Sequence, residues 1–426
     1  MKKLLALILA LVMVFSFAAC DEEKPANNND VNNGETEEPV ENGGDEVKKV
    51  KAGLICIGDA NDQGYTYNFI RAKDAATEIL KEKGIEVEWE IKYNLVEGDP
   101  VAVANEELAE DECEIIFNNS YGHEAAMLQI APDYPETTFI GCTADKSWQD
   151  DLENTCNVFN SAHEARYLAG VVSGMKLQEM IDNGEITPEE AVIGYVGAYS
   201  FAEVVSGFTA YYLGAKSVCP SVTMKVQFVG SWSDATLEAN AAQDLCDRGC
   251  KLISQHSDNT TPATTAETNG VFHVGYNADM ISAAPKASLV SSRINWTNYF
   301  VYAIECIANG EPVAQDYNHG LAEGEVELTT LNEDIVAAGT AEKVAEVAEG
   351  IKNGTVKVFD INTFTVNGEA VTASGPVIDT DGDWVPDFGE AIWDGELHES
   401  IAKDGYMSAP YFALRIDGIE WVNEAY

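Results

Sequence analysis

Short apolar, β-branched runs alternate with longer runs of helical period along most of the chain, beginning near residue 50. This alternation is typical of parallel sheets whose faces are covered by helices. In the first half of the pattern, strands are predicted at 50–58, 87–94, 113–119, 137–142 and 157–160. The helices of this half are predicted at 68–83, 101–110, 124–131 and 162–181.

The pattern then begins again, which indicates a second α/β unit of similar size rather than one long sheet. Its strands are predicted at 191–197, 222–230, 252–256 and 271–277, and its helices at 203–216, 235–248 and 261–268. A further strand at 288–295 and a helix at 299–308 could return to the first unit. We expect an α/β fold with two Rossmann-like lobes, joined by several crossovers and separated by a cleft.

The boundaries of the lobes follow from these elements. The N-terminal lobe is predicted to comprise residues 48–159 and about 286–330, and the C-terminal lobe residues 160–285 and about 331–370. Residues 371–426 are rich in strand and turn signals, and we expect them to form an extension that packs on the lobes.

Polar and aromatic side chains follow most of the predicted strands. Ligands of open α/β sheets bind beyond the carboxyl ends of the strands, so these residues are candidates for a binding site. Aromatic rings stack on a planar ligand, and carboxylate and amide groups fix its polar edge. The candidates are Asp62, Tyr65, Thr66, Asn118, Ser120, Tyr121, Tyr199, Phe201, Trp232, His256, Asn277 and Asp279. Trp232 could equally pack at the hinge.

The N-terminus reads as an export signal. Lys2 and Lys3 precede an apolar run, and the small residues before Cys20 resemble a bacterial lipobox. We therefore expect a signal peptide over 1–19 and a lipid on Cys20. A plain secretory signal or a short membrane span is the alternative. Residues 20–47 are rich in acids and Asn, and they predict a flexible tether.

The chain is strongly acidic, with 72 Asp and Glu against 25 Lys and Arg and a formal net charge of −47. Nucleic acid is excluded as a partner, because neutralising phosphates needs clustered basic residues. An acidic surface also disfavours phosphorylated ligands. Hydrophobic residues make up 46% of the chain, enough for a sizeable core. Beyond Cys20, we expect the cysteines to be mostly free, buried thiols.

Motifs for catalysis or nucleotide binding are missing from the sequence. There is no G-x-G-x-x-G, no G-x-x-x-x-G-K-[ST], no G-x-S-x-G and no H-E-x-x-H. Binding is the simpler interpretation than catalysis, and no catalytic residue and no required cofactor are predicted.

One acidic loop has the oxygen spacing of an EF-hand calcium site. Its candidate ligands are Asp379, Asp381, Asp383, Asp387 and Glu390. Trp384 stands where such a loop needs Gly, so an acidic surface turn is the alternative to a Ca²⁺ site.

Several segments resemble one known family. They are Gly64-Tyr-Thr-Tyr-Asn68, Ala131-Pro-Asp-Tyr-Pro135, Ala165-Arg-Tyr-Leu-Ala-Gly170, Val205-Ser-Gly-Phe208, Leu213-Gly-Ala-Lys216, Gly230-Ser-Trp-Ser-Asp234 and Val274-Gly-Tyr-Asn-Ala-Asp279. In this order they resemble the basic membrane protein family of substrate-binding lipoproteins of ABC transporters, whose best-understood members bind purine nucleosides. The resemblance spans roughly residues 50–330 and implies the type I periplasmic-binding-protein architecture.

The resemblance also implies roles for single residues. The family's purine-binding aspartate and stacking aromatic fall on Asp62 and Tyr65, with Thr66 where many members have Asn. The alternative to these ligand-binding roles is structural: Asp62 would cap a turn, and Tyr65 would staple the helix that follows. The ribose-binding aspartates fall on Asn277 and Asp279, of which the first is an amide. A lysine typical of nucleoside binders is missing near Ser291, which makes a nucleobase or another heterocycle a competitor.

Trp296 lies shortly after the position where that lysine is expected, and it could close over the ring of a heterocyclic ligand. Packing at the start of a helix is the alternative. We expect a monomeric, lipid-anchored binding protein on the extracytoplasmic face of the cell membrane. It would capture a purine nucleoside or base by lobe closure and deliver it to an ABC permease. A sensory lipoprotein, a binder of a non-purine heterocycle and an enzyme acting on nucleosides are the alternatives.

Overall fold

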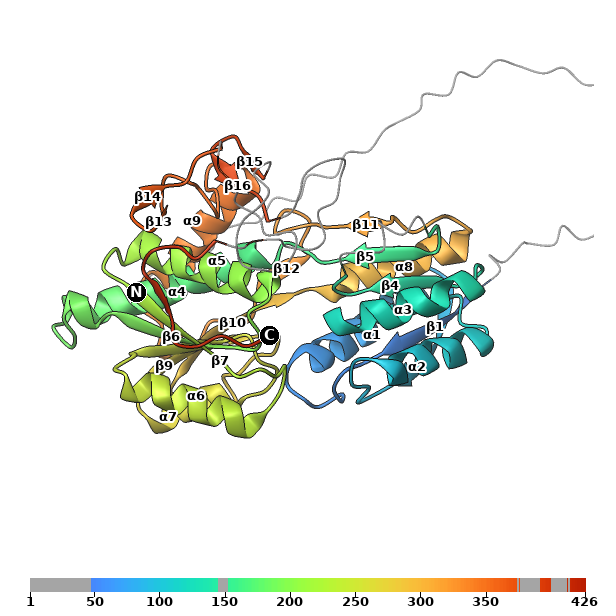
Figure 1. Cartoon of the computed structure of the whole chain (residues 1–426), viewed down its shortest axis with the longest axis horizontal. Coiled ribbons are helices and arrows are strands. Elements are labelled where there is room, and N and C mark those ends of the chain that lie inside the picture. Colours follow the sequence, from blue (N-terminus) through green and yellow to red (C-terminus); the bar gives the residue numbers. More distant parts are fainter. Residues whose placement is uncertain (1–46, 145–151, 374, 376–390, 400–411, 413) are drawn as a thin grey trace, which may run out of the picture. The chain divides into compact units, whose positions relative to one another are not determined.

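The computed structural model describes residues 47–144, 152–373, 375, 391–399, 412 and 414–426. They form two α/β lobes, each a mostly parallel sheet with helices packed on both faces (Figure 1). The predicted α/β class with two Rossmann-like lobes is confirmed.

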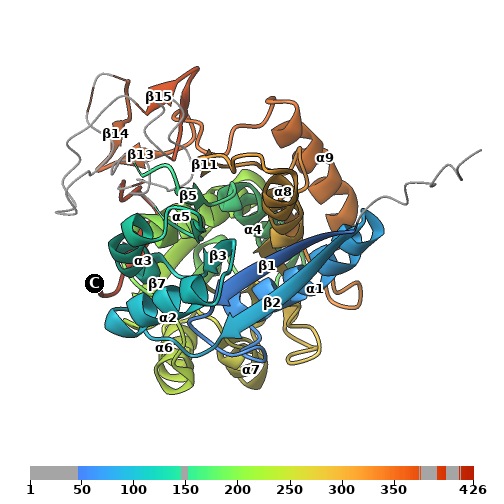
Figure 2. The same ribbon diagram turned by 90° about the vertical axis from the view of Figure 1, so that its right-hand side faces the viewer.

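The first lobe contains a six-stranded sheet in the order β11-β5-β4-β3-β1-β2. Its strands are β1 (Lys48–Ile55), β2 (Ile85–Lys92), β3 (Ile115–Asn118), β4 (Thr138–Gly141), β5 (Thr155–Val158) and β11 (Asp316–Tyr317). All neighbouring strands pair in parallel. Figure 2 shows α1 (Tyr65–Glu82) and α8 (Trp296–Asn309) on one side of this sheet, with α2 (Asp99–Glu110) and α3 (Glu124–Ile130) on the other.

The second lobe contains a seven-stranded sheet in the order β12-β10-β9-β8-β6-β7-β17. Its strands are β6 (Val192–Gly197), β7 (Thr223–Phe228), β8 (Leu252–Gln255), β9 (Phe272–Tyr276), β10 (Ser288–Ile294), β12 (Val326–Leu328) and β17 (Ile419–Trp421). Within the described part of this sheet, β12 is the one strand that runs antiparallel to its neighbour. The covering helices are α4 (Ala162–Asp182) and α5 (Ala202–Val218) on one face and α6 (Ala235–Asp247) and α7 (Thr261–Thr268) on the other.

Smaller elements complete the described chain. Helix α9 (Thr340–Lys352) packs on α4, and three short 3-10 helices lie at Tyr121–His123, Ala131–Asp133 and Pro188–Glu190. Two small hairpins pair β13 (Thr365–Val366) with β14 (Glu369–Ala370) and β15 (Ile392–Trp393) with β16 (Glu396–Leu397).

Helices α4 and α5 approach each other unusually closely because glycines line their contact. A Cβ atom added to Gly170 would meet the carbonyl oxygen of Tyr211, and one added to Gly214 would meet that of Tyr167. Only Gly lets two helix backbones come this near. The close contact holds α5 against α4, and the first turn of α5 reaches the cleft through Glu203.

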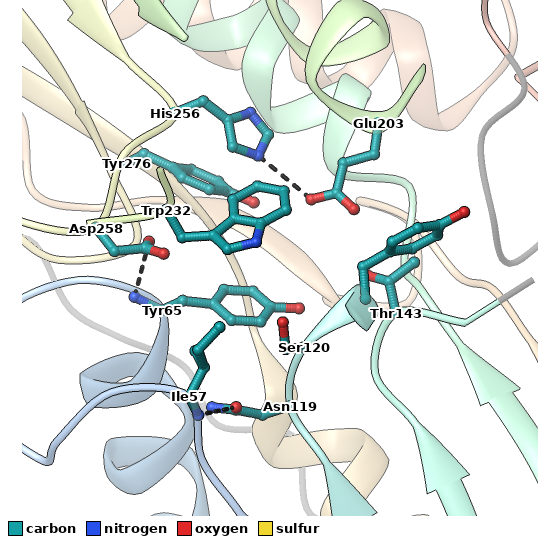
Figure 3. Close-up of a pocket in the computed structure, with 11 residues that line it drawn as sticks. Ile57, Tyr65, Asn119, Ser120, Thr143, Glu203, Trp232, His256, Asp258 and Tyr276 are labelled. Carbon is teal, nitrogen blue, oxygen red and sulfur yellow. Dashed lines mark hydrogen bonds and ion pairs between the residues drawn. The ribbon is translucent and has the colours of Figure 1, made fainter. Parts of the chain in front are cut away.

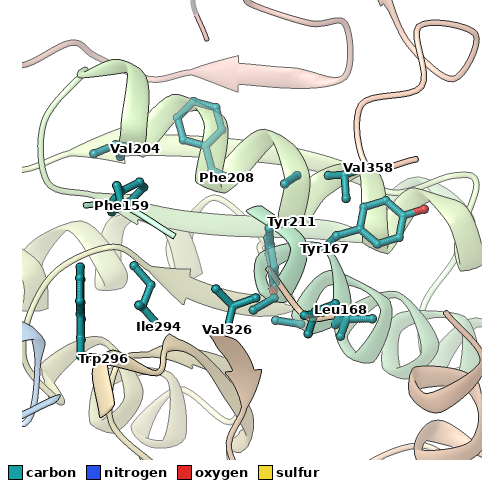
Figure 4. Close-up of a cluster of buried hydrophobic side chains, with 14 of the residues drawn as sticks. Phe159, Tyr167, Leu168, Val204, Phe208, Tyr211, Ile294, Trp296, Val326 and Val358 are labelled. Atoms are coloured by element: carbon teal, nitrogen blue, oxygen red, sulfur yellow. The ribbon is translucent and has the colours of Figure 1, made fainter. Parts of the chain in front are cut away.

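One hydrophobic core continues through the segments that join the lobes. Figure 4 shows part of it, with Phe159 from a connecting segment beside Val204 and Phe208 of α5, and Trp296 beside Ile294. Trp296 is fully buried and packs on Phe69, with ring centroids 4.4 Å apart. This residue is part of the core at the start of α8, which is the packing alternative that the sequence left open.

The structure corrects one predicted boundary. Residues 286–330 were assigned to the first lobe, but β10 and β12 belong to the second sheet, while α8 and β11 belong to the first lobe. The chain therefore crosses between the lobes after β5, after β10 and after β11. A buried strand has the same apolar pattern in either sheet, so the sequence does not show to which sheet the strand belongs.

The predicted extension also contributes to a lobe. Strand β17 pairs in parallel with β7, with Ile419 opposite Met224 and Trp421 opposite Val226. Of the eight described cysteines, all are free and seven are buried, as the apolar surroundings predicted.

Candidate functional site

A cavity lies between the two lobes, beyond the carboxyl ends of their strands (Figure 3). The lining residues are Ile57, Tyr65, Asn119, Ser120, Tyr121, Thr143, Glu203, Trp232, His256, Asp258 and Tyr276. The structure thus brings together Tyr65, Ser120, Tyr121, Trp232 and His256 from the residues proposed on sequence grounds.

Tyr65 forms the wall contributed by the first lobe. It is the first residue of α1, and its ring contacts Phe69 edge-on at 5.0 Å between centroids. Its hydroxyl donates a hydrogen bond to the carbonyl oxygen of Cys142 at 3.3 Å. Its backbone N–H donates across the cleft to Oδ1 of Asp258 at 3.0 Å. Hydrogen bonds thus hold Tyr65 at its backbone and at its hydroxyl, so its ring presents a fixed face to the cavity.

Asp62 lies just before α1 and accepts hydrogen bonds from the start of that helix. Its carboxylate accepts hydrogen bonds from the backbone N–H groups of Gly64, Thr66 and Tyr67, at 2.8, 3.1 and 2.9 Å. It therefore caps the start of α1, which is the alternative that the sequence left open. Burial raises its pKa, and these hydrogen bonds oppose that rise. Asp62 and Tyr199 line an outer cavity that shares Ile57, Trp232 and Asp258 with the inner one.

At the end of β3, the neighbouring asparagines have opposite roles. Asn118 exchanges two hydrogen bonds with Asn105 of α2, at 2.9 and 3.0 Å, and its side chain does not reach the cavity. Asn119 lines the cavity, accepts from the N–H of Ile57 at 2.8 Å and donates to Thr66 at 3.3 Å. The predicted Asn118 is therefore replaced by Asn119, and Thr66 supports it from behind.

Trp232 forms the wall contributed by the second lobe. Figure 3 shows its ring on the opposite side of the cavity from Tyr65. Its Nε1–H donates across the cleft to Glu97 at 3.3 Å, and the same carboxylate oxygen accepts from the hydroxyl of Ser120 at 2.8 Å. Tyr199 contacts the indole edge-on at 5.1 Å. Trp232 is therefore a cleft residue rather than a plug of the hinge.

Asp258 is a buried carboxylate at the end of β8 that the candidate set lacked. Its Oδ1 accepts from Tyr65 of the other lobe and from Nδ2 of Asn277 at 3.0 Å. Burial first, and then the charge of Asp62 and Glu238, raises its pKa well above the ordinary value. The predicted ribose ligand Asn277 thus supports Asp258, while the predicted Asp279 is exposed and accepts from the N–H of Ile281 outside the cavity.

Glu203 lines the cavity from the first turn of α5 and is held by two buried groups. Arg166, 1% exposed, donates to the carbonyl oxygen of Gln255 at 2.9 Å and to Nδ1 of His256 at 3.1 Å. Because a guanidinium only donates, Nδ1 is an acceptor, and His256 donates from Nε2 to Oε1 of Glu203 at 3.3 Å. Figure 3 shows this last hydrogen bond.

The pKa shifts of these two groups follow from that arrangement. Burial, and then Arg166, lowers the pKa of His256 well below its ordinary value, so the imidazole is neutral. Burial raises the pKa of Glu203 to about 7, while Arg166 opposes the rise. Glu203 can therefore offer either an acceptor or a donor near neutral pH.

The residues that sequence reasoning missed are Ile57, Asn119, Thr143, Glu203, Asp258 and Tyr276. Most lie within two residues of a strand end, where the carboxyl-end rule could have found them. Glu203 follows its strand at a greater distance, inside a helix. Phe201, which was predicted, stacks on Tyr199 at 5.0 Å and lies 5.9 Å from Tyr121, without lining the cavity itself.

No group of His, Cys, Asp and Glu within the described residues is placed to hold a metal ion. The predicted calcium ligands Asp379, Asp381, Asp383, Asp387 and Glu390 lie outside the described residues, as does the predicted lipidation site Cys20. The helices of the described chain include none with the length and apolarity that a membrane crossing needs.

An interlobe cavity at the carboxyl ends of two parallel sheets, with three crossovers as a hinge, defines a substrate-binding protein of the type I periplasmic class. Solved structures share this fold. A solute-binding protein from Aeropyrum pernix K1 matches with a TM-score of 0.59 and 17% identity, covering 72% of this chain and 92% of that one. One from Conexibacter woesei matches with a TM-score of 0.56 and 19% identity, covering 72% and 98%.

The chain belongs to the family of PnrA-like ABC transporter substrate-binding proteins, whose model matches residues 49–362. Among its relatives, a purine-binding protein of Brucella abortus is 29% identical over 317 residues, covering 73% of this chain and 83% of that protein. A Haloferax volcanii ABC transporter protein named for glucose is also 29% identical, over 331 residues, covering 78% and 79%. These are transport binding proteins rather than enzymes.

Proposed function

We propose that this chain is a lipid-anchored, extracytoplasmic receptor that captures a purine base or nucleoside and delivers it to the permease of an ABC importer. The observation that carries the proposal is the cavity between Tyr65 and Trp232, two rings from opposite lobes, with Glu203 and Asp258 at its polar edge. Aromatic faces stack on a planar heterocycle, and carboxylates accept hydrogen bonds from its N–H groups. The purine-binding relative supports the same ligand class.

Capture would proceed by closure of the lobes without a covalent step. Two hydrogen bonds cross the cleft in the described structure, from Tyr65 to Asp258 and from Trp232 to Glu97. Such contacts exist only when the lobes are together. A ligand that touches both walls binds the closed state more tightly than the open one and so shifts the population toward closure.

The charge of the cavity favours a ligand without phosphate. The described lining residues include two carboxylates and no lysine or arginine. The outer cavity adds Asp59, Asp62 and Glu97. A nucleotide would bring its negative charges against these groups, whereas a neutral base or nucleoside would not. Nucleotides are therefore expected to bind poorly.

Calorimetric titration with adenine, guanine, hypoxanthine, adenosine, inosine and guanosine tests the proposal, with AMP as the phosphorylated comparison. At least one base or nucleoside should bind, and Trp232→Ala should weaken it by about 10-fold or more, since a stacked ring is lost. Trp393→Ala, which alters a tryptophan of the β15–β16 hairpin, is the matched control and should leave affinity unchanged. Binding of none of the six would refute the purine assignment.

Glucose is a second candidate because one relative of equal identity is named for it. Aromatic faces and carboxylates also suit a sugar, which stacks through its C–H face and donates through its hydroxyls. Glucose therefore belongs in the same titration series. Binding of glucose without any purine would transfer the proposal to sugars and leave the transport role intact.

A further inference from the structure

The C-terminal segment, residues 419–426, lies outside the part of the chain that matches the family model. It nevertheless adds β17 to the edge of the second sheet, beside β7. The N–H of Val422 continues this pairing and donates to the carbonyl oxygen of Val226 at 2.8 Å. The strand therefore carries the residues that follow it toward the carboxyl end of the sheet, which is the end that faces the cavity.

Asn423 holds the end of β7. Its Oδ1 accepts from the N–H of Phe228 at 2.8 Å, and its Nδ2 donates to the carbonyl oxygen of Phe228 at 2.9 Å. Phe228 is the last residue of β7, four positions before Trp232. A side-chain amide that pairs with both backbone groups of one residue replaces the ladder partner that this strand end would otherwise lack.

Ala425 holds the loop after β6 in the same way. The N–H of Ser200 donates to the carbonyl oxygen of Ala425 at 2.6 Å, and the N–H of Ala425 donates to the hydroxyl of Ser200 at 3.0 Å. Ser200 is fully buried and stands between Tyr199 and Phe201, whose rings stack at 5.0 Å. Phe201 is also the N-cap of α5.

These two attachments meet at the aromatic wall of the cavity. The loop at Ser200 leads directly into Glu203, and the loop after Phe228 leads into Trp232. Tyr199 of one loop contacts Trp232 of the other at 5.1 Å. We propose that residues 423–426 are positioning residues of the binding site, which clamp both loops so that Trp232 and Glu203 face the ligand.

The experiment compares the wild-type chain with a chain that ends at Val422, and with Asn423→Ala, which is milder and removes only the attachment of β7. Asn332→Ala is the matched control, because its amide also donates to two backbone carbonyls of the second lobe, those of Pro285 and Ser288, away from the cavity. Thermal unfolding establishes that each variant is folded.

Amide hydrogen exchange without any ligand is the first measurement. In the shortened chain, amides of residues 198–204 and 228–234 should exchange at least about 10-fold faster, while those of 115–122 in the first lobe stay as in wild type. Asn423→Ala should loosen only 228–234, a split that general destabilisation does not give. Unchanged exchange in both loops of the shortened chain would overturn the inference, whatever the ligand is.

Titration with adenine and adenosine is the second measurement, and it rests on the proposed function. The shortened chain should bind about 5- to 30-fold more weakly than wild type, the effect of one or two net hydrogen bonds. Asn332→Ala should bind as wild type does. Loosened loops with unchanged affinity would overturn the positioning role. If wild type binds neither probe, the purine assignment fails for these probes and the exchange data alone decide the inference.

Discussion

Gly64 of the first lobe lies in close contact with the backbone of Asp258 in the second lobe, and replacing it with alanine should prevent full closure. A Cβ atom at this position would lie 2.5 Å from Cα, Cβ and the carbonyl oxygen of Asp258. Two of these three atoms belong to the backbone, so no rotation of a side chain relieves the overlap. The lobes would have to separate there until the contact reached about 3.4 Å, where ordinary van der Waals contact begins.

A separation of about 1 Å is enough to remove the hydrogen bond from Tyr65 to Asp258, which is 3.0 Å long in the closed structure. Because the pKa of Asp258 is raised, this hydrogen bond contributes about 0.5–3 kcal/mol, the range from a neutral to a charged acceptor. Ligand affinity should therefore fall by about 2- to 100-fold in Gly64→Ala. Unfolding should be little affected, because the overlap arises between lobes that can open and not within either core.

Gly207→Ala is a matched control on α5, beside the same cavity. Its Cβ would lie 3.5 Å from His256 and 3.6 Å from Arg166, which are ordinary contacts. Calorimetry with the ligand identified by the purine series should give near wild-type affinity for this variant. Small-angle scattering should show that ligand compacts wild type and Gly207→Ala but not Gly64→Ala. Equal affinity and equal compaction in Gly64→Ala would refute the assigned closure contact.

Three further predictions test single groups. Asp62→Ala should lower the free energy of unfolding by about 1–2 kcal/mol, because it removes a helix cap. Urea denaturation measures this change. Loss of ligand affinity at unchanged stability would instead make Asp62 a ligand contact. Burial raises the pKa of Glu203 to about 7, so ionisation of this group destabilises wild type as pH rises from about 4.5 through 7. The free energy of unfolding of Glu203→Gln should therefore exceed that of wild type by about 1–3 kcal/mol between pH 5 and 8. A pH-independent difference in urea denaturation would contradict that assignment. Cys20→Ala should abolish incorporation of labelled fatty acid and release the protein from membranes, and continued labelling would show that the lipid is elsewhere.

The sequence predicted the lobes well because their strands and helices differ in period and are each long enough to recognise. It also predicted five of the residues that line the interlobe cavity, since the carboxyl-end rule needs only the strand ends. It could not choose between Asn118 and Asn119, because successive residues of a strand point to opposite faces and the strand end decides the register. The structure resolves this through Asn105, which engages Asn118 from α2.

Residues whose role depends on a distant partner were the ones that sequence reasoning missed. No residue near Glu203 in the sequence indicates that His256, in the loop after β8, will fix its orientation, or that Arg166 of α4 will hold His256. Asp62 shows the converse, because a carboxylate just before a helix suits both a cap and a ligand contact. Only the three backbone N–H groups around it decide in favour of the cap.

The buried cysteines have a consequence for where this protein can fold. Burial raises the pKa of the thiol of Cys113 to about 11 and of Cys156 and Cys250 to about 12, so almost no reactive thiolate forms at neutral pH. The cores of both lobes form around reduced sulfur. The fold therefore needs no thiol oxidant or disulfide isomerase to assemble, and refolding from denaturant should proceed equally well with a reducing agent present. A receptor built this way can mature in surroundings without oxygen.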